Sequence, residues 1–264
     1  LSGSALEKQL EAWKTALANP PDPLDLPTDR PRPPIQTQAG ARRPVTIRPG
    51  LFAALDDLRR REGVTLYMTV LAAFAAVLGR TSGQEDIAVG APIAGRTRGE
   101  LEGLIGFFMN TVVLRADLSG EPSFRELCAR LKKVSLSAYQ NQDAPFERVV
   151  EVLSPERDMS RSPLFQAMFI LQNMPFPRLE AGPLSLHGSS VDTGTSKFDL
   201  TLELIQEDDS LRGFIEYNTD LFDAATIERM LAHYLTLLAG IVAAPDQKTW
   251  ELPLLPPDER ALVT

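Results

Sequence analysis

The sequence predicts an α/β fold, a two-layer sandwich in which helices pack on a mixed β-sheet. Three observations lead to this prediction. Segments with apolar residues every three or four positions alternate with short runs of β-branched and apolar residues. The runs at residues 198–205 and 211–217 are separated by a short polar turn, which is typical of an antiparallel hairpin. With 264 residues, of which 44% are hydrophobic, the chain can bury a sizeable core as one domain or two small ones.

The composition argues against several classes of function. The formal net charge of −8 disfavours nucleic acids and anionic membrane surfaces as main partners. The single cysteine, Cys128, excludes an internal disulfide and a cysteine metal cluster, and we expect no metal. Neither a signal peptide nor a bilayer-length apolar run is present, so we expect a cytoplasmic protein without membrane contact. The chain begins at Leu1, and we expect it to be a piece of a longer polypeptide.

The N-terminal part predicts a helix, a connector and a strand. Apolar residues at helical spacing indicate a helix over residues 5–17. Residues 19–34 are rich in proline, which fixes φ and removes amide donors, so they form an extended connector. Because this connector carries Leu24 and Leu26, we expect it to lie against a surface rather than to be a solvated linker. Residues 36–48 are expected to form a strand.

Two helices and a strand follow. The helix over residues 49–61 begins at a proline, and the helix over 65–79 is apolar over a stripe wide enough to imply deep burial. Residues 86–92 have strand character, and residues 101–104 are expected to form a helical turn.

Residues 105–115 are predicted to form a buried strand, because apolar residues occupy both of its alternating faces. Gly106 marks its start. Asn110 and Thr111 interrupt the run, and buried polar groups cost free energy unless they are hydrogen-bonded. Asn110 therefore either binds the backbone of a neighbouring loop or lines a passage where polar groups meet a substrate. Arg115 ends the run with a charge that needs a partner or water.

The second half continues the pattern. Residues 123–138 and 145–153 are expected to be helices, and Cys128 lies in the apolar stripe of the first, which indicates a core thiol rather than a nucleophile. Residues 164–171 and 184–187 have strand character, and they precede the predicted hairpin.

The end of the chain predicts one more helix and no catalytic motif. Asp223 is expected to cap a helix that runs to residue 242, and the tail after Gln247 shows little periodicity. His187 and His233 are the only histidines, and neither is followed by an aspartate four residues later. No Gly-x-Ser-x-Gly elbow or phosphate-binding glycine loop occurs. We interpret His233 as structural, whereas His187 either lines a site or simply belongs to a strand.

Several ordered stretches of the chain carry a family resemblance. One is Ile-Gly-Phe-Phe-Met-Asn-Thr at residues 105–111. The others are residues 24–33, 82–96, 141–147, 157–164 and 252–260. Together they resemble the condensation domains of nonribosomal peptide synthetases, over nearly the whole chain. The sequence departs from the family pattern at Gly95, Asn141 and Ser162, where the family often has Asn, His and Asn.

The resemblance implies a fold like that of chloramphenicol acetyltransferase, with two lobes in a V and the active site between them. This chain resembles only the C-terminal lobe, of the L-amino-acid type. The family's His-His-x-x-x-Asp-Gly motif belongs to the first lobe and is expected upstream of Leu1, so the chain alone should be inactive. Residues 1–34 would form the lobe-junction helix and connector, residues 35–246 the lobe, and residues 247–264 a linker toward an adenylation domain.

The implied reaction is peptide-bond formation between aminoacyl or peptidyl thioesters. Carrier domains deliver them on 4′-phosphopantetheine arms, and no cofactor is bound by the lobe itself. No catalytic residue is expected in this chain; the expected partners are the carrier domains, the N-terminal lobe and the adenylation domain. The resemblance implies that a substrate tunnel is lined by Asn110, Thr111, Ser196 and Asp199, with Ser196 at the acceptor side. The positions expected to serve as structural motif residues are Gly106, Arg115, Asp143, Pro145, Phe146, Arg157, Asp158 and Pro163, with Arg115 and Arg157 in ion pairs.

Two alternatives stay open. The chain could be a lobe of an epimerization or cyclization domain, which uses the same fold for different chemistry. It could also be a non-catalytic lobe that binds a carrier domain. An intact histidine motif upstream would distinguish catalysis from the carrier-binding alternative.

Overall fold

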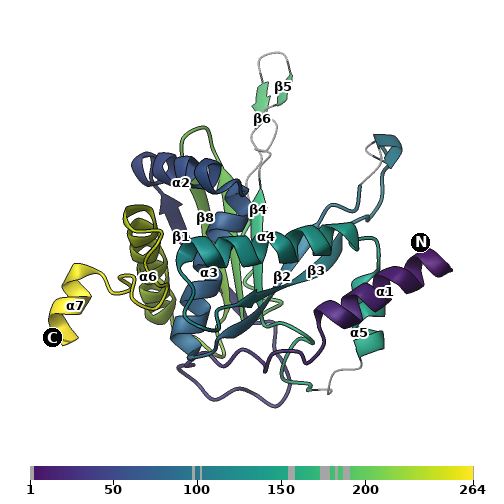
Figure 1. The fold of residues 1–264 in the computed structure, drawn as a ribbon, viewed down its shortest axis with the longest axis horizontal. Helices are drawn as coiled ribbons and strands as arrows, with labels where there is room; N and C mark the ends of the chain where they lie inside the picture. Colours follow the sequence, from purple (N-terminus) through teal and green to yellow (C-terminus); the bar gives the residue numbers. More distant parts are fainter. Residues whose placement is uncertain are drawn as a thin grey trace.

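The computed structural model describes residues 3–96, 99–101, 103–153, 158–172, 179–181, 184–186 and 191–263. In this part of the chain the main feature is a six-stranded mixed sheet with the order β1-β8-β7-β4-β2-β3 (Figure 1). Its strands are β1 (Gly40–Ile47), β2 (Asp86–Ile93), β3 (Asn110–Asp117), β4 (Ala167–Gln172), β7 (Leu200–Gln206) and β8 (Leu211–Asn218). β2, β4 and β7 are parallel to one another, β3 runs antiparallel to β2, and β8 runs antiparallel to both β7 and β1. The predictions of a mixed sheet and of a β7–β8 hairpin are confirmed.

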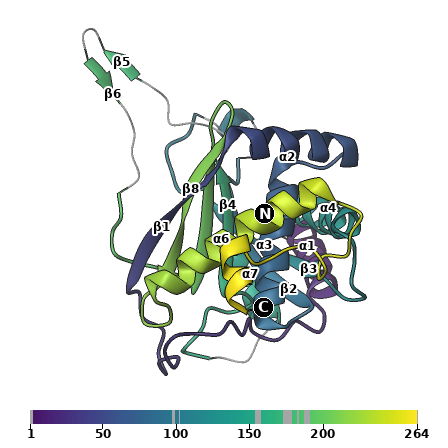
Figure 2. The same ribbon diagram turned by 90° about the vertical axis from the view of Figure 1, so that its left-hand side faces the viewer.

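Helices cover one face of this sheet, which gives the two layers (Figure 2). They are α2 (Pro49–Glu62), α3 (Leu66–Ser82), α4 (Phe124–Gln140) and α6 (Ala224–Ala243). α1 (Ser4–Ala16) and α5 (Phe146–Leu153) lie beside the β3 edge in Figure 1. Two short strands, β5 (Leu179–Ala181) and β6 (Leu184–Leu186), pair separately from the main sheet.

The central helix α3 has the local sequence signals from which it was predicted. The Thr65 hydroxyl accepts a hydrogen bond from the Met68 amide at 3.2 Å, which caps the helix start. Gly83 ends the helix with a left-handed φ of 74°. Between these caps nearly every residue is buried against the sheet and α6. At that contact the Tyr234 hydroxyl donates to the Val70 carbonyl at 3.1 Å.

The connector over residues 19–34 lies on the lobe, as predicted, with Leu24 and Leu26 buried. The predicted cap of α6 is wrong in its chemistry. Asp223 occupies the cap position but its side chain makes no capping bond. Asp29 of the connector does this instead: its carboxylate accepts from the Asp223 amide at 2.7 Å and from the Thr226 hydroxyl at 2.8 Å. These bonds lower the pKa of Asp29, the backbone bond most strongly.

The predicted buried strand at residues 105–115 is wrong in its first half. β3 begins only at Asn110, and the preceding side chains of Ile105, Phe107 and Met109 are 104%, 86% and 54% exposed. The apolar run led to a wrong prediction of burial. Such a run indicates that side chains favour burial, but it does not show which surface would cover them. In the described part of the chain, the segment between β2 and β3 extends away from the sheet (Figure 1). We call its described residues, 94–96, 99–101 and 103–109, the projecting loop; it contains a 3₁₀ turn at Gly99–Leu101, slightly before the turn that was predicted.

Two further observations complete the fold. The tail forms a short helix, α7 (Pro257–Val263), that its weak periodicity did not predict. The ring Nε2 of His233 in α6 lies 2.8 Å from the Glu259 carboxylate of α7, within hydrogen-bond distance, which agrees with a structural His233. Among the described helices, no single one is long and apolar enough to cross a membrane, although α2 and α3, bent by 105°, pass that test together by length and composition.

Candidate functional site

The sheet register separates the four expected tunnel residues into two groups. Asn110 pairs with Ile93 at one end of the sheet. Leu200, next to Asp199, aligns through β4 and β2 with Leu114 of β3. Asp199 therefore lies about five residues, or roughly 17 Å, further along the strand direction than Asn110, and three strands away. We call Asn110 and Thr111 the β3 site, and Ser196 and Asp199 the connector site. The structure does not bring the two sites together.

At the β3 site, the Asn110 side chain holds the loop between α4 and α5. Its Nδ2 donates to the carbonyls of Gln142 and Ala144, both at 2.8 Å. Its Oδ1 accepts from the Phe146 amide at 3.0 Å. A half-buried amide that makes three bonds to one loop fixes that loop against the end of β3. The geometry thus shows the loop-binding role that the sequence left open.

A hollow of about 820 Å³ lies beside this loop, and Asn110 and Thr111 form part of its wall. Its rim carries the carboxylates of Glu100, Asp143 and Glu147. No cationic side chain is among the described residues that line it. The hollow therefore favours a neutral or amine-bearing ligand over an anion.

Four of the expected motif residues lie on β3 or on the loop and helix that follow α4. Phe146 packs against Phe165 with ring centroids 5.7 Å apart, whereas Asp143 and Pro145 are exposed. Arg115 donates to both carboxylate oxygens of Asp86, at 2.6–3.0 Å, and to the Ala18 carbonyl at 2.9 Å. Its hydrogen bonds to Asp86 raise the pKa of Arg115.

The projecting loop has its own organising residue, which the sequence analysis missed. The Arg96 guanidinium lies 4.3 Å from the ring centre of Phe108 and donates to the carbonyls of Leu101 and Leu104. Gly95 adopts a φ of 64°, and a Cβ there would lie 1.9 Å from the Phe108 carbonyl oxygen. Glycine is therefore required at this departure from the family pattern. Gly106 lies in the same loop, close to the Phe108 ring.

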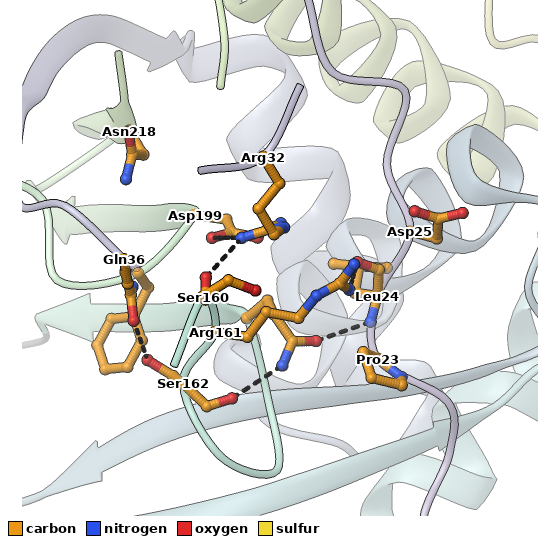
Figure 3. A network of polar contacts seen from close by, with 12 residues as sticks. Pro23, Leu24, Asp25, Arg32, Gln36, Ser160, Arg161, Ser162, Asp199 and Asn218 are labelled. Atoms are coloured by element: carbon orange, nitrogen blue, oxygen red, sulfur yellow. Dashed lines mark hydrogen bonds and ion pairs between the residues drawn. The ribbon is translucent and has the colours of Figure 1, made fainter. Parts of the chain in front are cut away.

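At the connector site, Asp199 is only 4% exposed and pairs with Arg32 of the connector (Figure 3). Arg32 Nη1 donates to Asp199 Oδ1 at 3.0 Å and to the Ser160 carbonyl at 3.2 Å, and Nη2 donates to Oδ2. Ser196 is also buried, and its hydroxyl donates to the Phe198 carbonyl at 2.6 Å. Both polar side chains are thus engaged within the lobe. Arg32 was not singled out, although it lies in a stretch that carried the family resemblance.

Gln166 joins the same network to the connector, since its main-chain carbonyl accepts from the Asp199 amide at 3.0 Å. Its Oε1 accepts from the Leu24 amide at 2.7 Å, and its Nε2 donates to the Ser162 carbonyl at 3.0 Å. Asp158 accepts from the amide and hydroxyl of Ser160, and these bonds lower the pKa of Asp158. Pro163 lines a surface pocket of about 690 Å³ between this loop and the connector.

Other expectations can be placed briefly. Cys128 is buried in α4, and burial raises the pKa of its thiol to about 12, which confirms a core thiol. Among the described residues, no group of three or more His, Cys, Asp and Glu side chains could hold a metal ion. Arg157 and His187 lie outside the described residues.

Known proteins resemble this chain both in sequence and in fold. The family model described as "Condensation domain" matches residues 1–264. A linear gramicidin synthase of Brevibacillus parabrevis is 49% identical over 265 residues, which cover 100% of this chain and 5% of that protein. A dimodular nonribosomal peptide synthase of Bacillus subtilis (strain 168) is 41% identical, with 98% of this chain and 11% of that protein covered. The chain thus spans only a small part of these curated relatives.

Solved structures show the same fold. A four-domain holo nonribosomal peptide synthetase bound to AMP and glycine matches with a TM-score of 0.90 and 28% identity, over 97% of this chain and 21% of that one. The X-domain from teicoplanin biosynthesis matches with a TM-score of 0.87 and 26% identity, over 96% and 58%. The first condensation domain of the CDA synthetase, 20% identical, shares the fold with a TM-score of 0.81 over 96% and 55%.

Proposed function

This chain belongs to the condensation domain family, and from that premise we propose that it is the C-terminal lobe of a domain that forms peptide bonds between carrier-bound thioesters. One observation carries the proposal. The chain matches the family model over its full length, yet covers only 55–58% of the chains of two structural neighbours, a condensation domain and an X-domain. It therefore corresponds in size to about half of such a domain. We assign residues 1–34 to the lobe junction, 35–246 to the lobe and 247–264 to a linker toward an adenylation domain.

In the proposed reaction, the acceptor amine attacks the carbonyl carbon of the donor thioester. A C–N bond forms, the C–S bond breaks, the donor 4′-phosphopantetheine arm leaves as a thiol, and the amine loses a proton. Aligning two tethered reactants supplies much of the catalysis, on the order of 7–11 kcal/mol of barrier lowering. The two histidines of this chain are not adjacent, so the paired-histidine motif would come from the N-terminal lobe.

The lobe's contribution would be the wall of the substrate tunnel. Asn110 and Thr111 would form the wall beside the acidic hollow, where the rim charges favour an amine. Ser196 and Asp199 would support the acceptor side from the other end of the sheet. The side chains of Asn110, Ser196 and Asp199 already form hydrogen bonds or ion pairs within the protein. We therefore assign them positioning roles rather than catalytic ones.

The projecting loop supports a second lobe as partner. Ile105, Phe107 and Met109 expose large apolar side chains on one short segment, and such groupings mark interaction sites. We propose that the N-terminal lobe covers them, and that carrier domains deliver the two thioesters to the tunnel between the lobes.

A two-carrier assay tests the function. One carrier domain holds a donor aminoacyl group and the other an acceptor, and intact-protein mass spectrometry follows the transfer. The chain is assayed alone and joined to its upstream lobe. Product only with the upstream lobe is the expected result. Product from this chain alone would overturn the split active site, and no product in either case would overturn the proposed reaction.

A second candidate is a non-catalytic lobe that recruits another protein. The X-domain resembles this chain at 26% identity, and a further structure is described as a complex of the X-domain with OxyB. That complex shows this fold engaged with another protein. Loss of the paired histidines from the upstream lobe, together with carrier binding but no product, would favour this candidate. An epimerization or cyclization lobe remains the other alternative, and the products in the same assay would reveal it.

A further inference from the structure

A smaller cavity, of about 240 Å³, lies between the helices and the sheet at the carboxyl ends of β2 and β4. Tyr67 in the first turn of α3 and Tyr139 in the last turn of α4 form one side. The strand ends form the other side, with Pro92, Ile93 and Ile170. None of the described residues that line it carries a charge. These five side chains are only partly buried, so the cavity has a mouth at the surface.

The hydroxyl of Tyr67 is the unusual group in this cavity. It is buried and makes no hydrogen bond to any residue in the described part of the chain. The Tyr67 ring is packed at 5.3 Å from the Phe169 ring, which holds the hydroxyl in place. Burial raises the pKa of Tyr67 and of Tyr139, so both hydroxyls stay protonated and can donate. A buried donor without a partner costs free energy, and proteins rarely leave one unless it has a ligand or water.

The position of the cavity relates it to the proposed tunnel. Ligands of α/β folds commonly bind outside the carboxyl ends of parallel strands. Pro92 and Ile93 pair directly with Thr111 and Asn110, so the cavity lies one strand from the β3 site. Its volume is below the ~300–1,000 Å³ of sites for drug-sized ligands, and it suits one amino-acid side chain.

We propose that this cavity binds the side chain of a carrier-bound amino acid, and that Tyr67 donates a hydrogen bond to an acceptor atom on that side chain. The inference rests on the proposed function. The favoured substrates are small and uncharged with one hydrogen-bonding oxygen, as in threonine. Charged side chains are disfavoured because the lining offers no counter-ion.

Two isosteric probes and one isosteric variant test the inference. N-acetyl-threonine and N-acetyl-valine, each as its N-acetylcysteamine thioester, differ only by a hydroxyl in place of a methyl. Ligand-observed NMR titration gives their affinities for the full chain and for Tyr67→Phe. We expect the threonine probe to bind about 3- to 10-fold more tightly than the valine probe, the effect of one hydrogen bond. Tyr67→Phe should remove this preference and leave valine binding unchanged.

A matched control is Tyr234→Phe, which deletes a hydroxyl that already has a protein partner, Val70, away from the cavity. It should keep the preference for threonine. Three results would each overturn the inference and indicate that the cavity holds only water. They are equal binding of the two probes, a threonine preference that survives in Tyr67→Phe, and no binding of either probe.

The two-carrier assay separates this inference from the proposed function. If the restored domain makes product and the threonine preference is independent of Tyr67, the cavity assignment fails and the function stands. If the preference depends on Tyr67 but no product forms, the function fails and the cavity assignment stands.

Discussion

Replacement of Asn110 by alanine should destabilise the lobe by about 2–4 kcal/mol. The side chain makes three hydrogen bonds to the loop between α4 and α5. Each bond contributes about 0.5–1.5 kcal/mol net, and groups that stay buried without a partner add a further cost. Urea unfolding of Asn110→Ala measures the loss. Hydrogen exchange should become faster at the Phe146 amide, which loses its acceptor.

Two variants make this prediction specific. Asn110→Asp keeps the acceptor for the Phe146 amide but turns an oxygen toward the carbonyls of Gln142 and Ala144, so it should destabilise the lobe at least as much as alanine. Asn141→Ala is the matched control, since in the described part of the chain the Asn141 side chain donates only to the exposed Ser137 carbonyl, at 2.8 Å. It should change the free energy of unfolding by less than about 1 kcal/mol.

The reasoning is refuted if Asn110→Ala unfolds within about 0.5 kcal/mol of the parent and the Phe146 amide keeps its protection. The tunnel role is tested separately in the domain with its upstream lobe restored. A full condensation rate in a stable Asn110→Ala variant would show that this side chain does not shape the tunnel.

Three further predictions concern buried polar groups. Arg32→Ala leaves the carboxylate of Asp199 buried without its cation, and urea unfolding should show a loss of about 3–5 kcal/mol. Burial raises the pKa of Glu203, so the folded state holds this proton to higher pH than the unfolded state and loses stability as pH rises. The stability of Glu203→Gln relative to the parent should therefore grow from about pH 4 to about pH 7, as followed by thermal unfolding. Tyr234→Phe removes the bond to the Val70 carbonyl and should cost about 1 kcal/mol in urea unfolding.

Each of these predictions has a result that would contradict it. Arg30→Ala breaks an exposed pair with Asp223 and should cost at most about 1 kcal/mol; an Arg32→Ala loss no larger than this would contradict the first prediction. A relative stability of Glu203→Gln that stays constant or falls over this pH range would contradict the second. Tyr67→Phe should not destabilise the fold, because its hydroxyl has no described partner; a loss as large as that of Tyr234→Phe would contradict the third.

The elements that sequence reasoning predicted well carry their own local signals. In α3, a threonine cap, a continuous apolar stripe and a glycine stop all lie within one short segment. The start of β3 carried no such signal. Whether an apolar run is a strand depends on the partner that pairs with it, and β2 pairs with β3 only from Asn110 onward. Local pattern therefore could not tell the exposed side chain of Phe107 from the buried one of Val113.

In the candidate site, too, the sequence indicated some of the residues but not the distant partners that they contact. Asn110 was identified as a polar residue that needs a partner, whereas Asp199 was expected in the tunnel only because of the family resemblance; the structure gives both side chains protein partners. Those partners could not be predicted, because Arg32 lies 167 positions from Asp199 and the carbonyls that Asn110 binds lie 32 and 34 positions away. Pairings at this distance are set by the three-dimensional packing of the lobe, not by spacing along the chain.

The contacts that hold the connector (residues 19–34) against the lobe have a consequence for building hybrid enzymes. Arg32 depends on Asp199, and Asp29 caps α6 at Asp223, so two contacts join the start of the chain to its last third. A recombination crossover between residues 35 and 198 would take the halves of both contacts from different parents. A crossover before residue 19 inherits both contacts intact. For exchange between synthetases, residues 19–34 therefore travel with the lobe they rest on, even though they form neither helix nor strand.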